Sequence, residues 1–168
     1  SFTNWRGMET SGGRRIARSF VIDVDTVKFC TPEMLERFKK FQLVTQYIID
    51  KEKEVEEYNK ANKIDDSNLV NGRRQTNLGI FRAYLNAYIA NCPYINKDMT
   101  FMVRQLAPTE NGIPIQIYAF SSNKSWIPYE NIQSDIFDHV FAVVTMFDLK
   151  IYQKPSSNSL LSSYGVME

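Results

Sequence analysis

The sequence predicts an α+β fold, a ferredoxin-like βαββαβ unit with an enlarged first helical crossover. Three observations carry this prediction. They are an early stretch with strand-like alternation, two later strand-like stretches joined by an Asn-Gly turn, and a long amphipathic helix followed by a short strand. In such a unit the helices pack on one face of an antiparallel sheet.

The first strand is predicted over residues 15–29, which read RIARSFVIDVDTVKF. Alternate positions in this stretch are apolar, as expected for a strand with one buried face. The residues expected to face the core are Ile16, Phe20, Ile22 and Val24.

The first helix is expected to begin at Pro32, with Thr31 as its N-cap. Its apolar residues recur every three or four positions, which places them on one side of the helix. They are Met34, Phe38, Phe41, Val44 and Ile48.

The crossover is enlarged by a helical insertion at about residues 42–92. The charged run Lys51–Lys63 holds few apolar residues. We therefore expect it to face solvent or a neighbouring subunit, and not the core.

A loop over residues 62–77, with the turn signal Asn71-Gly72, connects this run to a second helix. That helix is predicted over residues 78–92, capped by Thr76 or Asn77 and ended by Pro93.

Two strands, over residues 99–108 and 113–120, are predicted to form an antiparallel hairpin. The loop between them, Thr109–Gly112, ends in Asn-Gly, a strong hairpin signal. The residues expected on the buried side of the second strand are Ile113, Ile115, Ile117 and Ala119.

A long helix follows, with an apolar stripe broad enough to cover a sheet face. The stripe consists of Ile132, Ile136, Val140, Val143 and Phe147, widened by Phe137, Phe141 and Val144. The last strand is expected over residues 150–155.

The expected domain organisation has three parts. Residues 1–13 form the end of a preceding β domain and a hinge at Gly12-Gly13, residues 14–155 form the αβ domain, and residues 156–168 form a Ser-rich tail. Because the chain begins at Ser1 without Met, we expect it to be a piece of a longer protein.

The balance of 20 basic and 19 acidic residues gives no global attraction to nucleic acid or anionic membranes. We expect no transmembrane helix, because the most apolar stretch, residues 140–147, is far too short to span a bilayer. The two cysteines, Cys30 and Cys92, are interpreted as buried free thiols in a reducing cytosol.

No catalytic, cofactor-binding or metal-binding residues are predicted, and we expect no enzyme. The lone His139 is interpreted as a helix residue whose neighbours Asp135 and Asp138 offer too few ligands for a metal. Solvation accounts for the carboxylates at Asp65-Asp66 and at Glu52–Glu57. No nucleophile motif surrounds Ser11, Ser134 or Ser156.

Nucleic acid is not an expected partner. The aromatic residues Phe101, Tyr118 and Phe120 are interpreted as core residues, because no RNA-binding signature surrounds them. The basic pairs Arg14-Arg15 and Arg73-Arg74 are expected to meet water or neighbouring carboxylates.

Four stretches together resemble the cytoplasmic C-terminal part of the small-conductance mechanosensitive channel family, in particular a bacterial subgroup with an enlarged cytoplasmic domain. They are NWRGMETSGGRRIARSFVID (residues 4–23), TNLGIFRAYLNAYI (residues 76–89), MVRQLAPTENGIPIQIYAF (residues 102–120) and WIPYENIQSDIFDHVFAV (residues 126–143). The likeness runs from about residue 2 to Ser156.

The resemblance implies a vestibule domain on the cytoplasmic face of the bacterial inner membrane, in a channel that opens under membrane tension. Its implied partners are identical subunits, typically in a heptamer, the membrane through an N-terminal region outside this chain, and ions in transit. Two alternatives stay open: a ferredoxin-like module that binds RNA or a small ligand, and a plain oligomerisation domain.

Overall fold

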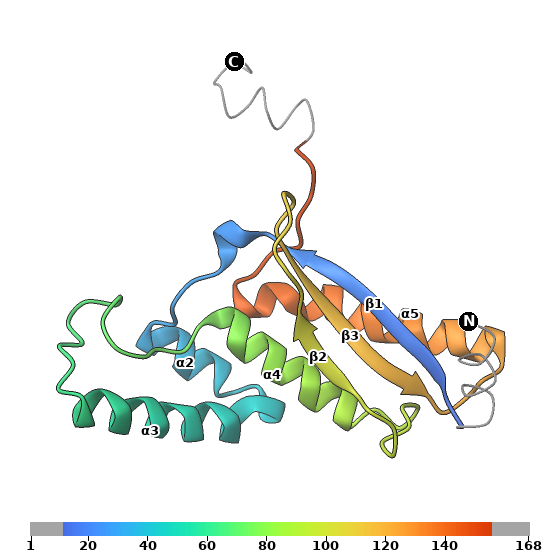
Figure 1. Ribbon diagram of the computed structural model, residues 1–168, viewed down its shortest axis with the longest axis horizontal. Helices are drawn as coiled ribbons and strands as arrows, with labels where there is room; N and C mark the ends of the chain where they lie inside the picture. Colours follow the sequence, from blue (N-terminus) through green and yellow to red (C-terminus); the bar gives the residue numbers. More distant parts are fainter. Residues whose placement is uncertain (1–11, 156–168) are drawn as a thin grey trace.

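The computed structural model describes residues 12–155 and has an α+β fold with a three-stranded antiparallel sheet (Figure 1). The strands are β1 (Arg14–Ile22), β2 (Met102–Gln105) and β3 (Ile113–Ser121), in the order β1-β3-β2. The expected lead-in and Ser-rich tail lie largely outside the described residues.

Four α-helices accompany the sheet in the described chain. They are α2 (Pro32–Phe38), α3 (Thr45–Ala61), α4 (Asn77–Ala90) and α5 (Trp126–Val143). Three short 3-10 turns, η1 (Val24–Thr26), η2 (Gln42–Val44) and η3 (Val144–Phe147), lie in the connections.

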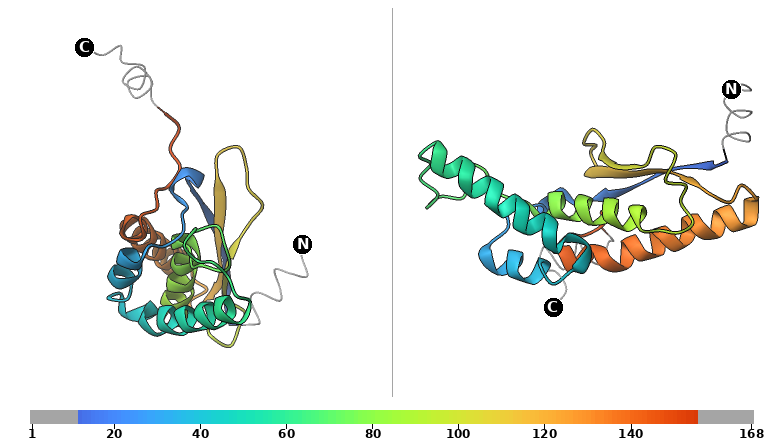
Figure 2. Two further views of the ribbon diagram at one scale, coloured as in Figure 1. Left: turned by 90° about the vertical axis from the view of Figure 1, so that its left-hand side faces the viewer. Right: turned by 90° about the horizontal axis from the view of Figure 1, so that it is seen from below.

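The sheet and two of the helices form two layers. Helices α4 and α5 lie on one face of the sheet, and no described helix covers the opposite face (Figure 2, right). We call this opposite face the helix-free face.

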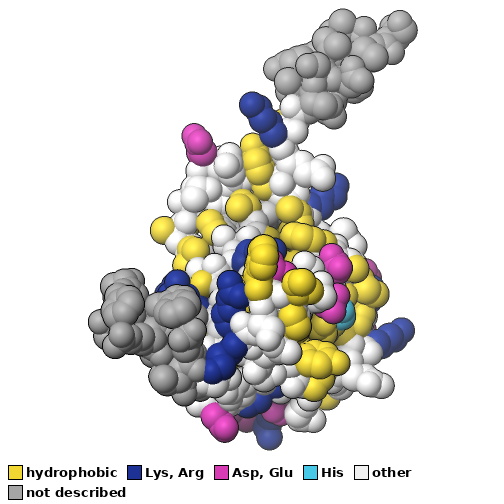
Figure 3. Space-filling view, turned by 90° about the vertical axis from the view of Figure 1, so that its right-hand side faces the viewer, with side chains coloured by type: hydrophobic (Ala, Val, Ile, Leu, Met, Phe, Trp, Pro, Cys, Tyr) yellow, Lys and Arg dark blue, Asp and Glu magenta, His cyan; other side chains and the backbone are white. Residues whose placement is uncertain are grey.

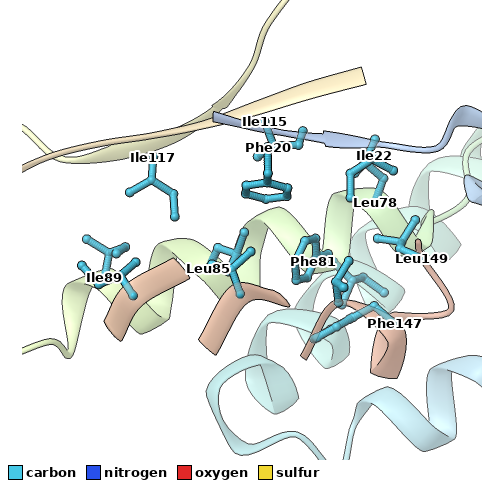
Figure 4. Packing of buried hydrophobic residues seen from close by; sticks show 14 of the residues in the cluster. Phe20, Ile22, Leu78, Phe81, Leu85, Ile89, Ile115, Ile117, Phe147 and Leu149 are labelled. Atoms are coloured by element: carbon cyan, nitrogen blue, oxygen red, sulfur yellow. The ribbon is translucent and has the colours of Figure 1, made fainter. Parts of the chain in front are cut away.

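The core lies between the two layers. The predicted alternation is confirmed in β3, where Ile115, Ile117 and Ala119 are fully buried. The side chains on the buried face of the sheet point toward α4, as Figure 4 shows for Phe20, Ile22, Ile115 and Ile117 over Leu78, Phe81, Leu85 and Ile89. The Phe20 ring meets the rings of Phe81 and Phe137 edge-on, with centroids 6.1 and 6.3 Å apart.

In place of the predicted last strand, the structure has a single antiparallel bridge between Ile151 and Ile22. The Asp23 amide donates to the Lys150 carbonyl at 2.9 Å, and the Tyr152 amide donates to the Val21 carbonyl at 2.8 Å. The C-terminal segment therefore lies beside β1, at the sheet edge away from β2.

The first strand is shorter than predicted. It ends at Ile22, because the Asp23 side chain accepts from the Asp25 amide at 3.0 Å and caps η1. The expectation of a buried Val24 is wrong, since its side chain is 55% exposed.

The first predicted helix is divided into α2 and α3. Its beginning is confirmed, because Thr31 caps α2 and Pro32 opens it. Phe41 adopts an extended conformation, and the Thr45 hydroxyl donates to the Lys39 and Phe41 carbonyls at 2.6 and 3.2 Å. These side-chain bonds replace the continuous helical ladder at the break.

The charged run behaves as expected. Ile48 is the one buried residue of α3, and no residue from Lys51 to Lys63 is buried. The far half of α3 projects beyond the sheet (Figure 2, right). The core therefore does not use this part of the insertion.

Gly13 has a packing role in addition to its expected hinge position. It is buried, and a Cβ atom there would lie 2.8 Å from Met99 Sδ and 2.9 Å from Phe120 Cβ. A side chain would therefore collide with the start of the sheet.

Candidate functional site

His139 belongs to an aromatic cluster between α5 and α4. Its ring stacks on Tyr88 at a centroid distance of 4.0 Å, and its Nε2 shares a 2.7 Å hydrogen bond with the Tyr84 hydroxyl. Burial lowers the pKa of His139. The cluster holds the two helices together, in line with the interpretation of His139 as a helix residue.

The carboxylates are not brought together. Among residues 12–155, no group of three His, Cys, Asp or Glu side chains could hold a metal ion. Asp65 accepts from the amide and hydroxyl of Ser67 in its own loop, at 3.1 and 2.6 Å. Ser134 is exposed on α5, while Ser11 and Ser156 lie outside the described residues.

The cysteines are both free. Cys30 is buried as expected, and burial raises the pKa of its thiol to about 12, so it stays protonated and unreactive at neutral pH. Cys92 is only half-buried, which corrects the expectation that both thiols are buried.

The first basic segment is held by aromatic residues of α5. The Arg14 guanidinium lies 4.3 Å from the centroid of the Tyr129 ring, and Arg18 lies 5.5 Å from that of Phe137. The Tyr129 hydroxyl donates to the Arg15 carbonyl at 2.6 Å. These contacts fix β1 against α5.

The second basic pair holds a loop. Arg73 forms an ion pair with Glu54 of α3 at 3.0 Å, as expected for a neighbouring carboxylate. Arg74 instead donates to two backbone carbonyls, those of Leu69 at 3.1 Å and Asp66.

The helix-free face is the first candidate interaction surface. Tyr118 and Phe120 lie here, because their parity in β3 is opposite to that of Ile115 and Ile117. Their rings meet edge-on, with centroids 5.7 Å apart. The interpretation of these two aromatic residues as core residues is therefore wrong, whereas Phe101 does pack against the core.

Basic residues flank the two rings. Arg15 pairs with Phe120 in the register of β1 and β3, and Arg104 of β2 donates to the Gln116 side chain at 2.7 Å. The sequence carried this signal, since the parity of the isoleucines in β3 already assigns Tyr118 and Phe120 to the opposite face.

The beginning of α5 is the second candidate interaction surface. Trp126 and Ile127 are 68% and 70% exposed. Figure 3 views the molecule from this end and shows hydrophobic side chains gathered beside basic ones. Exposed apolar side chains that gather into one patch mark contacts with other chains, whereas single exposed ones are common on any surface.

Comparison with known protein families finds no family model that matches the chain. Among the described residues, no helix has the length and apolarity that a membrane span requires.

Proposed function

We propose that the chain is the cytoplasmic vestibule domain of a subunit of a tension-gated channel, similar to the small-conductance mechanosensitive family. The observation that carries this proposal is the position in the fold of the four stretches that resemble the family. They supply β1, α4, the β2–β3 hairpin and α5, which are the sheet and the two helices that cover it. Helices α2 and α3 lie outside these stretches. The insertion was expected at about residues 42–92, which also includes α4, but α4 covers the sheet and is not an added part.

The sheet order also supports a ferredoxin-like unit. With the Ile151 bridge beside β1, the strands run in the order last, first, third, second, and α4 and α5 lie on one face. This arrangement is the one expected for the βαββαβ order.

In this proposal the domain is not catalytic and acts through assembly. Identical subunits, seven in the resembling family, form a cage below the membrane, and its portals and charge bias the entry of ions. The cage influences gating only if its packing differs between the closed and open states. The two candidate interaction surfaces are the faces available for subunit contacts.

An assembly measurement tests the proposal. We expect the full-length protein, purified in detergent, to show the mass of a ring of subunits by native mass spectrometry. Replacing Trp126→Ser and Ile127→Ser together should weaken the ring while leaving the circular dichroism spectrum unchanged, because both side chains are exposed. Val70→Ser is the matched control, since Val70 is 71% exposed in the loop after α3.

A monomeric full-length protein would contradict the proposal. So would a coding sequence upstream of Ser1 that encodes a long polar region without apolar segments of about 20 residues.

A second candidate function is favoured by the helix-free face. Tyr118 and Phe120, flanked by Arg15 and Arg104, resemble the aromatic platforms on which single-stranded RNA stacks. Fluorescence anisotropy with a labelled single-stranded RNA distinguishes the two. Salt-dependent binding that Tyr118→Ala abolishes would favour the RNA module, and no binding is expected of the channel domain.

A further inference from the structure

The helical insertion forms a pocket that is open to solvent on one side. It has a volume of about 340 Å³ and lies between α3, the loop after α3 and Cys30. This volume falls at the lower end of the range for small-molecule sites. Its apolar wall is formed by Cys30, Leu35, Val55 and Ile64.

One side of α3 supplies the polar wall. Glu52, Glu56, Asn59 and Lys60 recur at helical spacing, so they lie on one face of the helix toward the loop. From the loop side, the wall is completed by Asp66, Arg73, Arg74 and Gln75.

The pocket is preformed, because the loop is tied to α3. The Asn59 side chain donates to the Arg73 carbonyl at 3.0 Å and accepts from the Arg73 amide at 2.9 Å. Gly72 has a φ of 70°, and a Cβ atom there would lie 2.4 Å from Asn59 Oδ1. The close approach of loop and helix therefore depends on this glycine.

The pocket wall carries charged side chains of both signs, and three of them, Glu56, Lys60 and Asp66, are exposed to solvent. Glu52 pairs with Lys39 at 2.7 Å, and Arg73 pairs with Glu54. Among residues 12–155, however, no ion pair engages Glu56, Lys60, Asp66 or Arg74. The Arg74 guanidinium is held in place by neutral carbonyls alone, so its charge is oriented but not neutralised.

We propose that this pocket binds a small zwitterion, with a carboxylate toward Lys60 and Arg74 and an ammonium toward Glu56 and Asp66. A plain anion of the same size would approach two carboxylates that form no ion pair, and a plain cation would approach two basic groups that form no ion pair. A short apolar chain between the two charged ends would meet Val55 and Ile64. A ligand with both charges therefore fits the wall best.

Titration of the 168-residue chain with 4-aminobutyrate, followed by nuclear magnetic resonance, tests the proposal. We expect saturable shifts in residues 56–60 and 73–75, with a Kd on the order of 1 mM for so small a ligand. Butyrate and butylammonium, which each keep one of the two charges, should bind at least about tenfold more weakly.

Variants in matched pairs locate the site. Lys60→Gln and Glu56→Gln should each weaken binding about tenfold. Lys53→Gln and Glu57→Gln remove the same charges from positions of α3 outside the pocket and should leave binding unchanged.

Three results would overturn the proposal: no saturable shift up to about 20 mM ligand, butyrate or butylammonium binding as tightly as 4-aminobutyrate, or equal weakening by the control variants. The channel proposal is not affected by any of them, because this binding is measured without assembly or membrane.

Discussion

Asn77, at the start of α4, connects three segments that are far apart in the sequence. Its side chain is fully buried. Its Oδ1 accepts from the Lys28 amide at 3.0 Å, and its Nδ2 donates to the carbonyls of Thr26 at 2.9 Å and Phe147 at 3.1 Å. The connection after β1, α4 and η3 are thereby held at one point.

Replacing Asn77→Ala is expected to lower the free energy of unfolding by about 3 kcal/mol, because it leaves several buried backbone groups without partners. Urea denaturation measures the change. Asn86→Ala, at an exposed position of the same helix, should change it by less than about 0.5 kcal/mol. A similar small change in both variants would show that the buried amide does not hold the three segments.

His139 predicts a pH dependence of stability. Burial lowers its pKa in the folded chain, so the unfolded chain binds the proton more readily. The free energy of unfolding should therefore decrease as the pH falls below the unfolded value of about 6.5, since the unfolded state then binds more protons.

The variant His139→Gln lacks this titration. The difference in stability between wild type and variant should shrink as the pH falls from about 7.5 to about 5.5, measured by urea denaturation at each pH. Parallel pH profiles for the two proteins would contradict the assignment.

Single-residue roles were predictable where a local rule decides them. Thr31 as an N-cap and the buried isoleucines of β3 follow from short-range patterns. Asn77 was expected only as a possible cap, and Thr76 takes that role by accepting from the Gly79 amide at 3.0 Å. The partners of Asn77 lie 49 to 71 residues away, so no local pattern indicates them.

Among the elements, the outer half of α3 is expected to be dispensable for folding. Replacing residues 51–68 by a short Gly-Ser linker should preserve a cooperative unfolding transition, monitored by circular dichroism. The ion pairs that are lost, such as Lys39–Glu52, lie at the surface, where solvent screening leaves them little effect on stability.

Ile48→Ala provides the comparison within the same helix. Ile48 is fully buried, and its truncation should cost about 2–5 kcal/mol. If the deletion abolishes folding while Ile48→Ala is mild, the charged run is part of the core after all.

Element types were more predictable than element ends. The end of β1 depends on the Asp23 cap, and the break before α3 depends on the Thr45 hydroxyl. Both are side-chain hydrogen bonds that compete with regular backbone hydrogen bonds. The spacing of apolar residues in the sequence does not reveal them.

At the scale of the whole molecule, the order of elements indicated helices on one face of an antiparallel sheet, and the structure has that arrangement. The helix-free face and the exposed start of α5 follow from it. The pocket in the insertion could not be predicted, because it depends on how a loop of polar residues folds back onto α3.

Patch-clamp recording of the full-length protein tests the central proposal most directly. The protein would be expressed in bacterial spheroplasts that lack other tension-gated channels, and suction would be increased in steps. We predict discrete openings whose probability rises with tension, also in a variant that lacks residues 51–68. Full-length protein that is present in the membrane but gives no tension-dependent current would contradict the proposed function.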